Sequence, residues 1–472
     1  MWPKTSQCKR LMRSLGLLAI SAFVIQFGNR LWSPIAVHAQ QSVTCADWAK
    51  SAGDVPPVPT VIDSTCAVIP PDFKGTPVQK ALDLYSWVAF LAVNWPACQG
   101  TCAADNNLSI LTSAPSQVPP VWTTYLQDSD VFVPSGQQPA AWCFAASYPK
   151  QLNASARSYR LAHLPPKVRA LANKHPEVTL FLHHDAKAVD RSALLRAVAA
   201  DQSSPLPEIL QATGDILVDQ NGRWARFTVA MNKDEYNYIV SKTLWTKAGQ
   251  KNAGIVTFPV TPTGAIEFKS AWKVLGSGDD ASHFFTTSAI VYNDADGAPS
   301  PGPNPVTVGL VGLHIVHKTG LQPKWIWSTF EQVENDTKSF YNSSCSVKQC
   351  PPNKPTVASP ATALELDANG KPNYAPAQVV AVTPASAQHL NSAFQKMLAG
   401  TPWAYYQLIS TQWVGELGSG PKPPQLGNSV QETFLPAGPM YSCMKCHSYA
   451  TLKGSPKVSA DFSYMLMFAP QQ

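Results

Sequence analysis

The sequence predicts an α+β fold, in which a central and mostly antiparallel β-sheet is flanked by helices and followed by a helical C-terminal segment. A strong helical pattern at residues 76–95 precedes the strands, and helical patterns return after residue 387. Between them, residues 210–335 carry β-branched and aromatic runs separated by turn residues. Because helices and strands occupy separate stretches of the chain, the pattern favours the α+β class.

Composition and pattern divide the chain into five regions. They are a signal peptide at 1–39, a mixed helical region at 40–209, an antiparallel β region at 210–335, a Pro- and Ser-rich linker or excursion at 336–386, and a helical segment at 387–472. Without the first region, about 430 residues would suit two or three ordinary domains or one large, elaborated domain.

The first region has the order of a secretory signal. Basic residues precede an apolar stretch at 15–27, and small residues around Ala39 offer a cleavage site. The apolar stretch is shorter than the roughly 18 to 20 residues that span a bilayer, so we expect cleavage near Ala39 and not an anchor. No later stretch is long and apolar enough to span, which predicts an exported mature chain.

The N-terminal helix has clear boundaries in the sequence. Thr76 is a suitable N-cap, Pro77 fits the first helical position, and Pro96 ends the pattern. Further along, residues 178–182 read as a short strand and residues 192–199 as a helix.

Three pairs of extended segments make up the β region. The first pair flanks Asn221-Gly222, the strongest short hairpin signal. The others lie at 254–275 and 306–333, and their alternation places His314 and His317 on opposite strand faces. On the last strand Trp325, Trp327, Thr329 and Glu331 share one face, where core packing is the favoured role for the tryptophans.

Helical signals dominate the last region. An apolar stripe at helical spacing ends at Gly400, a natural residue just past a helix end. The stripe consists of Leu390, Phe394, Met397 and Leu398. A second helix is expected at 401–413, and residues 429–432 have the S-x-x-E shape of a capping box.

Cysteine usage and charge suggest an oxidising compartment and a loop-rich chain. Of the 10 cysteines, close spacing suggests three bridges, although sequence does not fix connectivity. The suggested bridges are Cys45–Cys66, Cys98–Cys102 and Cys345–Cys350, with Cys143 left unpaired. Charged residues make up only 14%, the net charge is +6, and there is no Lys/Arg run, so no nucleic-acid partner is expected.

The most specific motif is Cys443-Met444-Lys445-Cys446-His447. A CxxCH sequence is the attachment signature of a c-type haem, because two thiols at this spacing reach the two vinyl groups on one porphyrin edge. The following imidazole then binds iron as the proximal ligand. A zinc site would need further Cys or His at similar spacing nearby, and the tail offers none.

Several phrases along the chain resemble one family. They are SWVAFLAVNWPA, ILVDQNGRWARF, NKDEYNYIV, GAIEFKSAWKVL, VGLVGLHIVHKT, WIWSTFEQVEN and SCMKCHSYA. Together they resemble a group of exported bacterial proteins called "cytochrome c family protein". The resemblance runs from about residue 76 to the C-terminus and implies one C-terminal haem on a larger body. It supports Cys443, Cys446 and His447 as the haem residues and carries no catalytic residue.

Export and the CxxCH motif together predict a periplasmic monohaem c-type cytochrome with one covalent haem c. One-electron transfer with periplasmic redox partner proteins is the leading function, because the haem supplies redox chemistry that the protein tunes. A haem-dependent peroxidase or oxidase and a haem-based ligand sensor are the alternatives.

The tail after His447 is too short for a separate cytochrome domain, so we expect the haem to dock on the main body with the preceding helices in its pocket. The distal iron position has three kinds of candidate: Met465 or Met467, His314 or His317, and an open site. Met465 or Met467 is slightly favoured, because both lie close to His447 in the sequence.

Overall fold

The computed structural model describes most of the chain in seven stretches. These are residues 42–143, 154–182, 225–292, 304–336, 385–415, 420–432 and 442–471. Several expectations fall outside these stretches. They concern the signal peptide, the helix at 192–199, the Asn221-Gly222 hairpin turn, the Cys345–Cys350 bridge and nearly all of the 336–386 linker.

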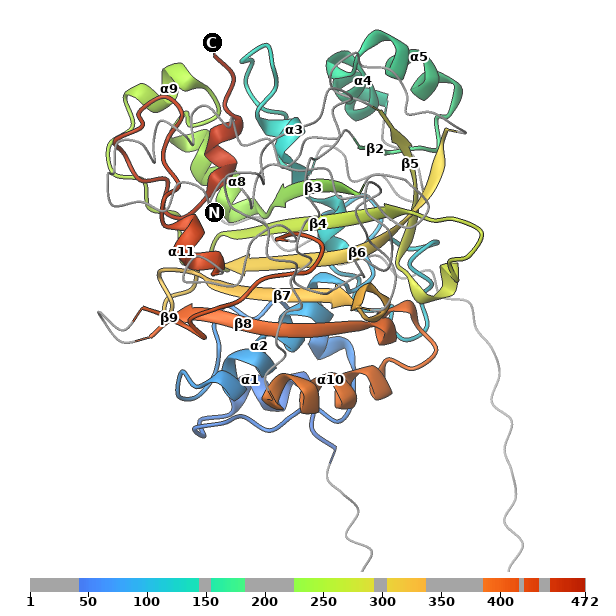
Figure 1. Ribbon diagram of the computed structural model, residues 1–472, viewed down its shortest axis with the longest axis vertical. Helices are drawn as coiled ribbons and strands as arrows, with labels where there is room; N and C mark the ends of the chain where they lie inside the picture. Colours follow the sequence, from blue (N-terminus) through green and yellow to red (C-terminus); the bar gives the residue numbers. More distant parts are fainter. Residues whose placement is uncertain are drawn as a thin grey trace, which may run out of the picture.

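The architecture is α+β, as the sequence predicts, and is built on one nine-stranded sheet (Figure 1). The main path runs β1-β3-β4-β6-β7-β8-β9, while β5 pairs with β6 and β2 pairs with β5. All described pairs of strands are antiparallel except β2 with β5. The strands are β1 (Leu126–Gln127), β2 (Leu180–Leu182), β3 (Arg226–Met231), β4 (Ile266–Val274), β5 (Thr286–Val291), β6 (Val306–His317), β7 (Ile326–Gln332), β8 (Tyr406–Val414) and β9 (Pro421–Lys422).

Two helices, α2 (Gln79–Val93) and α10 (Ala385–Met397), lie together on one face of the sheet beside β8 (Figure 1). Aromatic rings join the layers: Trp87 stacks on Phe394 with centroids 4.8 Å apart, and Phe90 stacks on Phe330 at 4.4 Å. All four side chains are fully buried. Burying a side chain of this size stabilises the fold by about 1.5–3 kcal/mol, so this face holds the main core.

The other helices are shorter and lie around the rest of the sheet. They are α1 (Cys45–Lys50), α3 (Asp128–Val131), α4 (Ala154–His163), α5 (Pro166–Lys174), α8 (Lys233–Ser241), α9 (Lys247–Lys251) and α11 (Cys443–His447). Short 3₁₀ turns include η2 (Val121–Thr124), η5 (Pro402–Tyr405) and η6 (Tyr464–Phe468). Within the described stretches, none of the helices combines the length and the apolar character that crossing a membrane requires.

The start of α2 differs from the sequence expectation. The helix begins at Gln79 with Val78 as N-cap, two residues later than Pro77. The hydroxyl of Thr76 donates to Asp54 at 3.0 Å and is not used to cap the helix. Because Asp54 engages the Thr76 hydroxyl, Thr76 does not cap α2, and the helix begins at Gln79.

The predicted helix at 401–413 is wrong. After η5 the chain becomes β8, which pairs antiparallel with β7. The run is rich in β-branched residues, and pairing with β7 buries Tyr406 and Leu408 in the core. The helix before it is confirmed as α10, with Leu390 and Phe394 fully buried and Gly400 at a φ of 84°.

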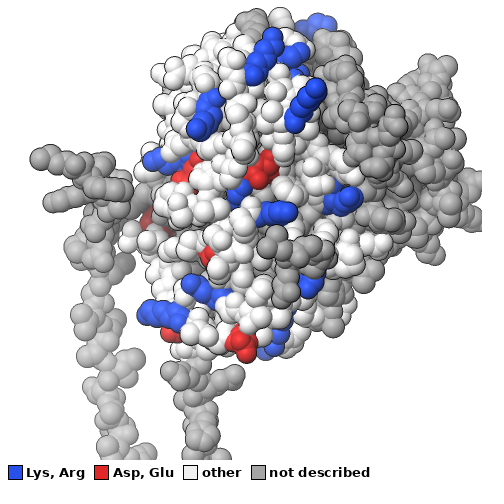
Figure 2. All heavy atoms as spheres, turned by 90° about the vertical axis from the view of Figure 1, so that its left-hand side faces the viewer, with Lys and Arg blue, Asp and Glu red and all other residues white. Residues whose placement is uncertain are grey.

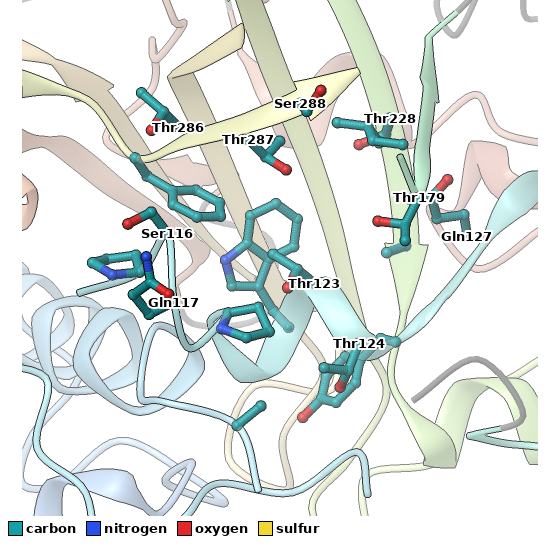
Figure 3. A pocket seen from close by; sticks show the side chains of 18 of the residues that line it. Ser116, Gln117, Thr123, Thr124, Gln127, Thr179, Thr228, Thr286, Thr287 and Ser288 are labelled. Carbon is teal, nitrogen blue, oxygen red and sulfur yellow. The ribbon is translucent and has the colours of Figure 1, made fainter. Parts of the chain in front are cut away.

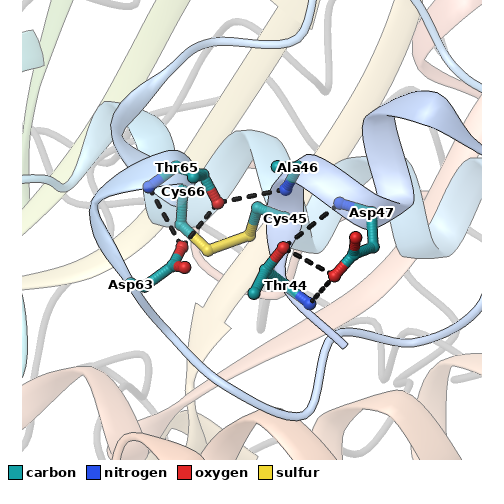
Figure 4. The surroundings of a disulfide bond; sticks show 7 residues. All are labelled: Thr44, Cys45, Ala46, Asp47, Asp63, Thr65 and Cys66. Atoms are coloured by element: carbon teal, nitrogen blue, oxygen red, sulfur yellow. Dashed lines mark hydrogen bonds between the residues drawn. A yellow bond between two sulfur atoms is a disulfide. The ribbon is translucent and has the colours of Figure 1, made fainter. Parts of the chain in front are cut away.

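Two disulfides form in the described stretches. Cys45–Cys66 is confirmed and joins α1 to the turn at 64–67, where Asp63 and Thr44 hold the adjoining backbone through hydrogen bonds (Figure 4). The second bridge is Cys102–Cys143, so the predicted Cys98–Cys102 loop and the unpaired Cys143 are both wrong. The short sequence spacing favoured Cys98 as the partner of Cys102. In the folded chain Cys102 instead meets Cys143, which is 41 positions away in the sequence.

Candidate haem-attachment site

The CxxCH motif forms the short helix α11, which is anchored to the sheet face opposite α2 and α10. Ser442 caps the helix by accepting from the Lys445 N–H at 3.2 Å. The side-chain oxygen of Gln412 on β8 accepts from the Met444 N–H at 2.9 Å. The expectation that the preceding helices form the haem pocket is therefore wrong for α10, which lies across the sheet.

The two thiols of the motif are reduced and held apart. Cys443 is buried with its Sγ 3.6 Å from the Leu426 carbonyl, and Cys446 is half-buried. Burial raises the pKa of Cys443 well above its usual value and that of Cys446 to about 12. Both are neutral thiols, whereas catalytic cysteines have lowered pKa values.

The donor atoms of the motif do not converge as they would around a bare metal ion. In the described residues, no three His, Cys, Asp or Glu side chains come together in a geometry that could hold one. Two separated thiols and one imidazole on a single turn fit covalent attachment at a porphyrin edge together with one axial bond.

His447 is oriented by a backbone carbonyl. Its Nδ1 lies 2.7 Å from the carbonyl oxygen of Phe462, which can only accept, so Nδ1 carries the proton. The other nitrogen, Nε2, therefore has a free lone pair and no hydrogen-bond partner among the described residues. Burial lowers the pKa of His447 to about 4, which keeps the ring neutral. The edges of Trp327 and Tyr464 pack on it, each with a centroid distance of 5.0 Å.

The Phe462 carbonyl is itself held by an unusual turn. Asp461 and Phe462 adopt left-handed φ values of 53° and 71°, which cost energy for residues other than glycine. The turn is fixed from outside: the Trp325 indole donates to the Asp461 carbonyl at 2.8 Å, and the Phe258 N–H donates to its carboxylate at 2.8 Å. The buried ammonium of Lys318 pairs with the same carboxylate. We call Asp461 and Phe462 the support turn.

A polar row lies on the sheet face that α11 covers. Lys269 on β4 is in register with His314 on β6, which is in register with Thr329 on β7. Nε2 of His314 donates to Glu432 at 3.2 Å, and its Nδ1 lies 3.1 Å from the Thr329 hydroxyl. Lys269 lowers and Glu432 raises the pKa of His447, which shows that the row lies near the motif.

Of the other distal candidates, His317 lies on the opposite face of the sheet, whereas Met465 lies in the same apolar cluster as Cys443 and Trp327. His317 points to the face of α2, where its Nδ1 hydrogen-bonds with the Tyr85 hydroxyl and its Nε2 donates to the Thr263 carbonyl at 2.8 Å. Met465 and Met467 are buried in η6, directly after the support turn that contacts the Nδ1 side of His447. Of the four residues, only His314 faces the motif from the sheet.

Sequence reasoning missed the residues that support the motif. Gln412 and the Lys318–Asp461 pair stand in no local pattern, and Lys318 and Asp461 are 143 positions apart. The S-x-x-E pattern offered one partial signal: Glu432 reaches back to the Asn428 N–H at 2.9 Å, while Ser429 donates to Glu331. The Glu432 N–H donates to the Asn428 carbonyl and the Ser429 hydroxyl to Glu331, so residues 429–432 do not make the reciprocal bonds of a capping box.

A pair of buried carboxyl groups was also missed. Glu235 of α8 and Glu267 of β4 are both buried, and neither oxygen of Glu235 has a hydrogen-bond partner in the described stretches. Burial raises the pKa of Glu267 to about 7, and burial together with Glu267 raises the pKa of Glu235 well above its ordinary value. The pair therefore holds protons at neutral pH.

No protein-family model, no curated protein and no solved structure matches the chain. Function is therefore argued from the chemistry of the site.

Proposed function

We propose that the protein is an exported, periplasmic c-type cytochrome that carries one covalent haem and transfers single electrons. The observation that carries the proposal is the arrangement of His447, with Nδ1–H bound to the Phe462 carbonyl and Nε2 free, on the same helical turn as two reduced thiols. When bound, the haem supplies an iron that alternates between two oxidation states.

The residues around the motif have distinct tasks in this proposal. Cys443 and Cys446 hold the porphyrin edge through thioether bonds, and His447 provides the axial nitrogen. A histidine whose other N–H is bound to a carbonyl keeps one ring orientation and gains basicity as a ligand. The rings of Trp327 and Tyr464 restrict its rotation further and exclude water from it.

We assign the distal side to His314. It is the described histidine that shares the sheet face of α11, and its side chain is only 5% exposed. Release of Nε2 from Glu432 would let the imidazole bind iron and complete a six-coordinate centre suited to electron transfer.

The His314–Glu432 pair also favours one second candidate function, a haem peroxidase. A distal imidazole that stays hydrogen-bonded to a carboxylate is placed to move protons, with Lys269 4.0 Å from the same carboxylate. Rapid turnover of hydrogen peroxide and a high-spin ferric spectrum would favour this candidate. Six-coordinate low-spin iron that is inert to peroxide and carbon monoxide would favour electron transfer.

The surface near the motif favours an acidic redox partner. Figure 2 shows separate basic side chains, and fewer acidic ones, on the side of the molecule where α9 and α11 lie. Lysines of the elements on this side include Lys242, Lys247, Lys251, Lys445 and Lys457. Complementary charge of this kind speeds encounter more than it tightens binding.

Haem attachment can be tested directly. The full chain, expressed in a bacterium with c-type haem attachment, should retain haem through denaturing electrophoresis, and its intact mass should exceed the polypeptide mass by one haem. The Cys443→Ala/Cys446→Ala variant should lose both signals, whereas Cys45→Ala/Cys66→Ala should keep them. A wild-type chain without covalent haem under these conditions would overturn the proposal.

A further inference from the structure

A second cavity lies across the sheet from the haem motif. It has a volume of about 390 Å³ and is bounded by η2, by Thr228 and Trp272 on β3 and β4, and by residues 286–288 of β5 (Figure 3). The sheet curls here, because β5 and β2 leave β6 and bring β2 into contact with β3. The volume falls within the 300–1,000 Å³ that small-molecule sites commonly occupy.

Uncharged hydroxyl and amide side chains dominate the polar lining. Figure 3 labels ten of them, and Thr286, Thr287 and Ser288 follow one another on β5. None of these three side chains makes a hydrogen bond within the described stretches. Neighbours on a strand point to opposite sides, and Thr287 lies on the other side of β5 from Thr286 and Ser288, so it is the Thr287 hydroxyl that this strand offers to a ligand in the cavity (Figure 3). A hydroxyl both donates and accepts, which suits a ligand that does the same.

Aromatic rings form the apolar part of the wall. Trp122 and Trp272 stack with centroids 6.3 Å apart, and both line the cavity. Their indole N–H groups are already used, since Trp122 donates to Asn94 at 3.0 Å and Trp272 donates to Ser270 at 2.9 Å. The rings therefore offer carbon surface to a ligand and no further donors.

Among the described residues that line the cavity, no charged group is left uncommitted for an ionic ligand. Arg160 is the cation in its described lining, and it is committed to Asp130 through bonds of 2.8 and 2.6 Å. Glu177 lies in the exposed rim and hydrogen-bonds with His175 at 3.2 Å. A carboxylate, phosphate or ammonium ligand would find no uncommitted partner.

We propose that this cavity binds a neutral polyhydroxylated molecule the size of a mono- or disaccharide. A purely apolar ligand would remove water from the lining hydroxyls without replacing its hydrogen bonds, which is unfavourable. A sugar pairs with those hydroxyls through its own and lays its C–H surface on the indole rings. The site is separate from the haem motif, so the proposal stands or falls independently of the proposed function.

Ligand-observed saturation-transfer NMR on the purified full chain tests the proposal. The panel contains glucose, galactose, mannose, maltose, cellobiose and trehalose, with glucuronate, glucosamine and cyclohexanol as charged and apolar probes. We expect at least one neutral sugar to bind with saturable affinity and to bind at least tenfold more tightly than all three other probes. Absence of binding by every neutral sugar at millimolar concentration would overturn the proposal, as would equal binding of the charged or apolar probes.

Substitutions then locate the site. Thr287→Val removes one hydroxyl while keeping the shape, and we expect a five- to tenfold loss of affinity, the size of about one net hydrogen bond. Thr287→Trp should abolish binding by filling the cavity. Thr257→Val, an exposed threonine outside the cavity lining, is the matched control and should bind as the wild type does. Unchanged affinity in both Thr287 variants would show that the sugar binds elsewhere and would refute the assignment.

Discussion

His447 donates its Nδ1–H to the carbonyl oxygen of Phe462 at 2.7 Å, and this single bond fixes which ring nitrogen carries the proton and which keeps a free lone pair. The carbonyl can hold that position because the support turn is tied to β6 through Lys318 and to β7 through the turn that ends at Trp325. The orientation of the His447 ring on α11 is thus coupled to β6 and β7 through the support turn.

Loosening the support turn should change the haem potential without removing the haem. In Asp461→Asn the ammonium of Lys318 loses its charged partner, and the Phe462 carbonyl should be held less firmly. A weaker bond to Nδ1–H makes His447 a poorer donor to iron, so the reduction potential should rise. Spectroelectrochemical titration measures it. Asp280→Asn, at an exposed aspartate, is the control, and equal potentials for both variants would contradict the coupling.

The distal assignment predicts different effects for two histidines of the same strand. His314→Ala should change the absorption spectrum of the haem and permit carbon monoxide binding, because it opens the face opposite His447. His317→Gln should leave the spectrum unchanged, because His317 is bound to Tyr85 and Thr263 on the other side of the sheet. Met465→Leu should also leave the absorption spectrum unchanged. A wild-type spectrum in His314→Ala would remove His314 from the distal side.

The buried carboxyl pair predicts that stability falls as pH rises. The pKa of Glu267 in the folded protein, about 7, lies above its usual value of 4.5, so the folded protein binds more protons than the unfolded chain in this interval. The free energy of unfolding should therefore decrease from about pH 5 to pH 7, by up to about 1.4 kcal/mol per pH unit for each proton released.

Glu235→Gln removes one acid of the pair and should flatten this decrease. Urea unfolding between pH 5 and pH 8 measures the slope, with the exposed Glu177→Gln as the matched control. A slope as steep as that of the wild type in Glu235→Gln would mean that the pair is not protonated together in the folded protein.

The Cys45–Cys66 bridge closes a loop with a sequence separation of 21 residues. Cross-linking a loop of this length restricts the unfolded chain, and replacing both cysteines by alanine should reduce the free energy of unfolding by about 3 kcal/mol. Thr44→Ala, which removes the N-cap of α1, should cost about 1 kcal/mol in the same urea titration. A double alanine variant as stable as the wild type would rule out this account of the bridge.

Much of the sheet could be read from local pattern. Alternation along residues 306–333 predicted β6 and β7, and it correctly placed His314 and His317 on opposite faces. The helical start signal at Thr401-Pro402 wrongly predicts that residues 406–414 are helical. In the structure, pairing with β7 outweighs that local signal and makes them a strand. The Cys102–Cys143 bridge was missed because near spacing says nothing of which thiols the fold brings together.

By itself, the sequence determined the α+β class, the α10 stripe and a five-residue motif with the spacing of haem attachment. Each of these depends on residues within a few positions of one another, where periodicity and spacing carry the information. Only the tertiary structure decided which face of the sheet α11 occupies, which carbonyl orients His447, and which hydroxyls meet across the second cavity. Those features join residues that are distant along the chain, and only packing brings such residues together.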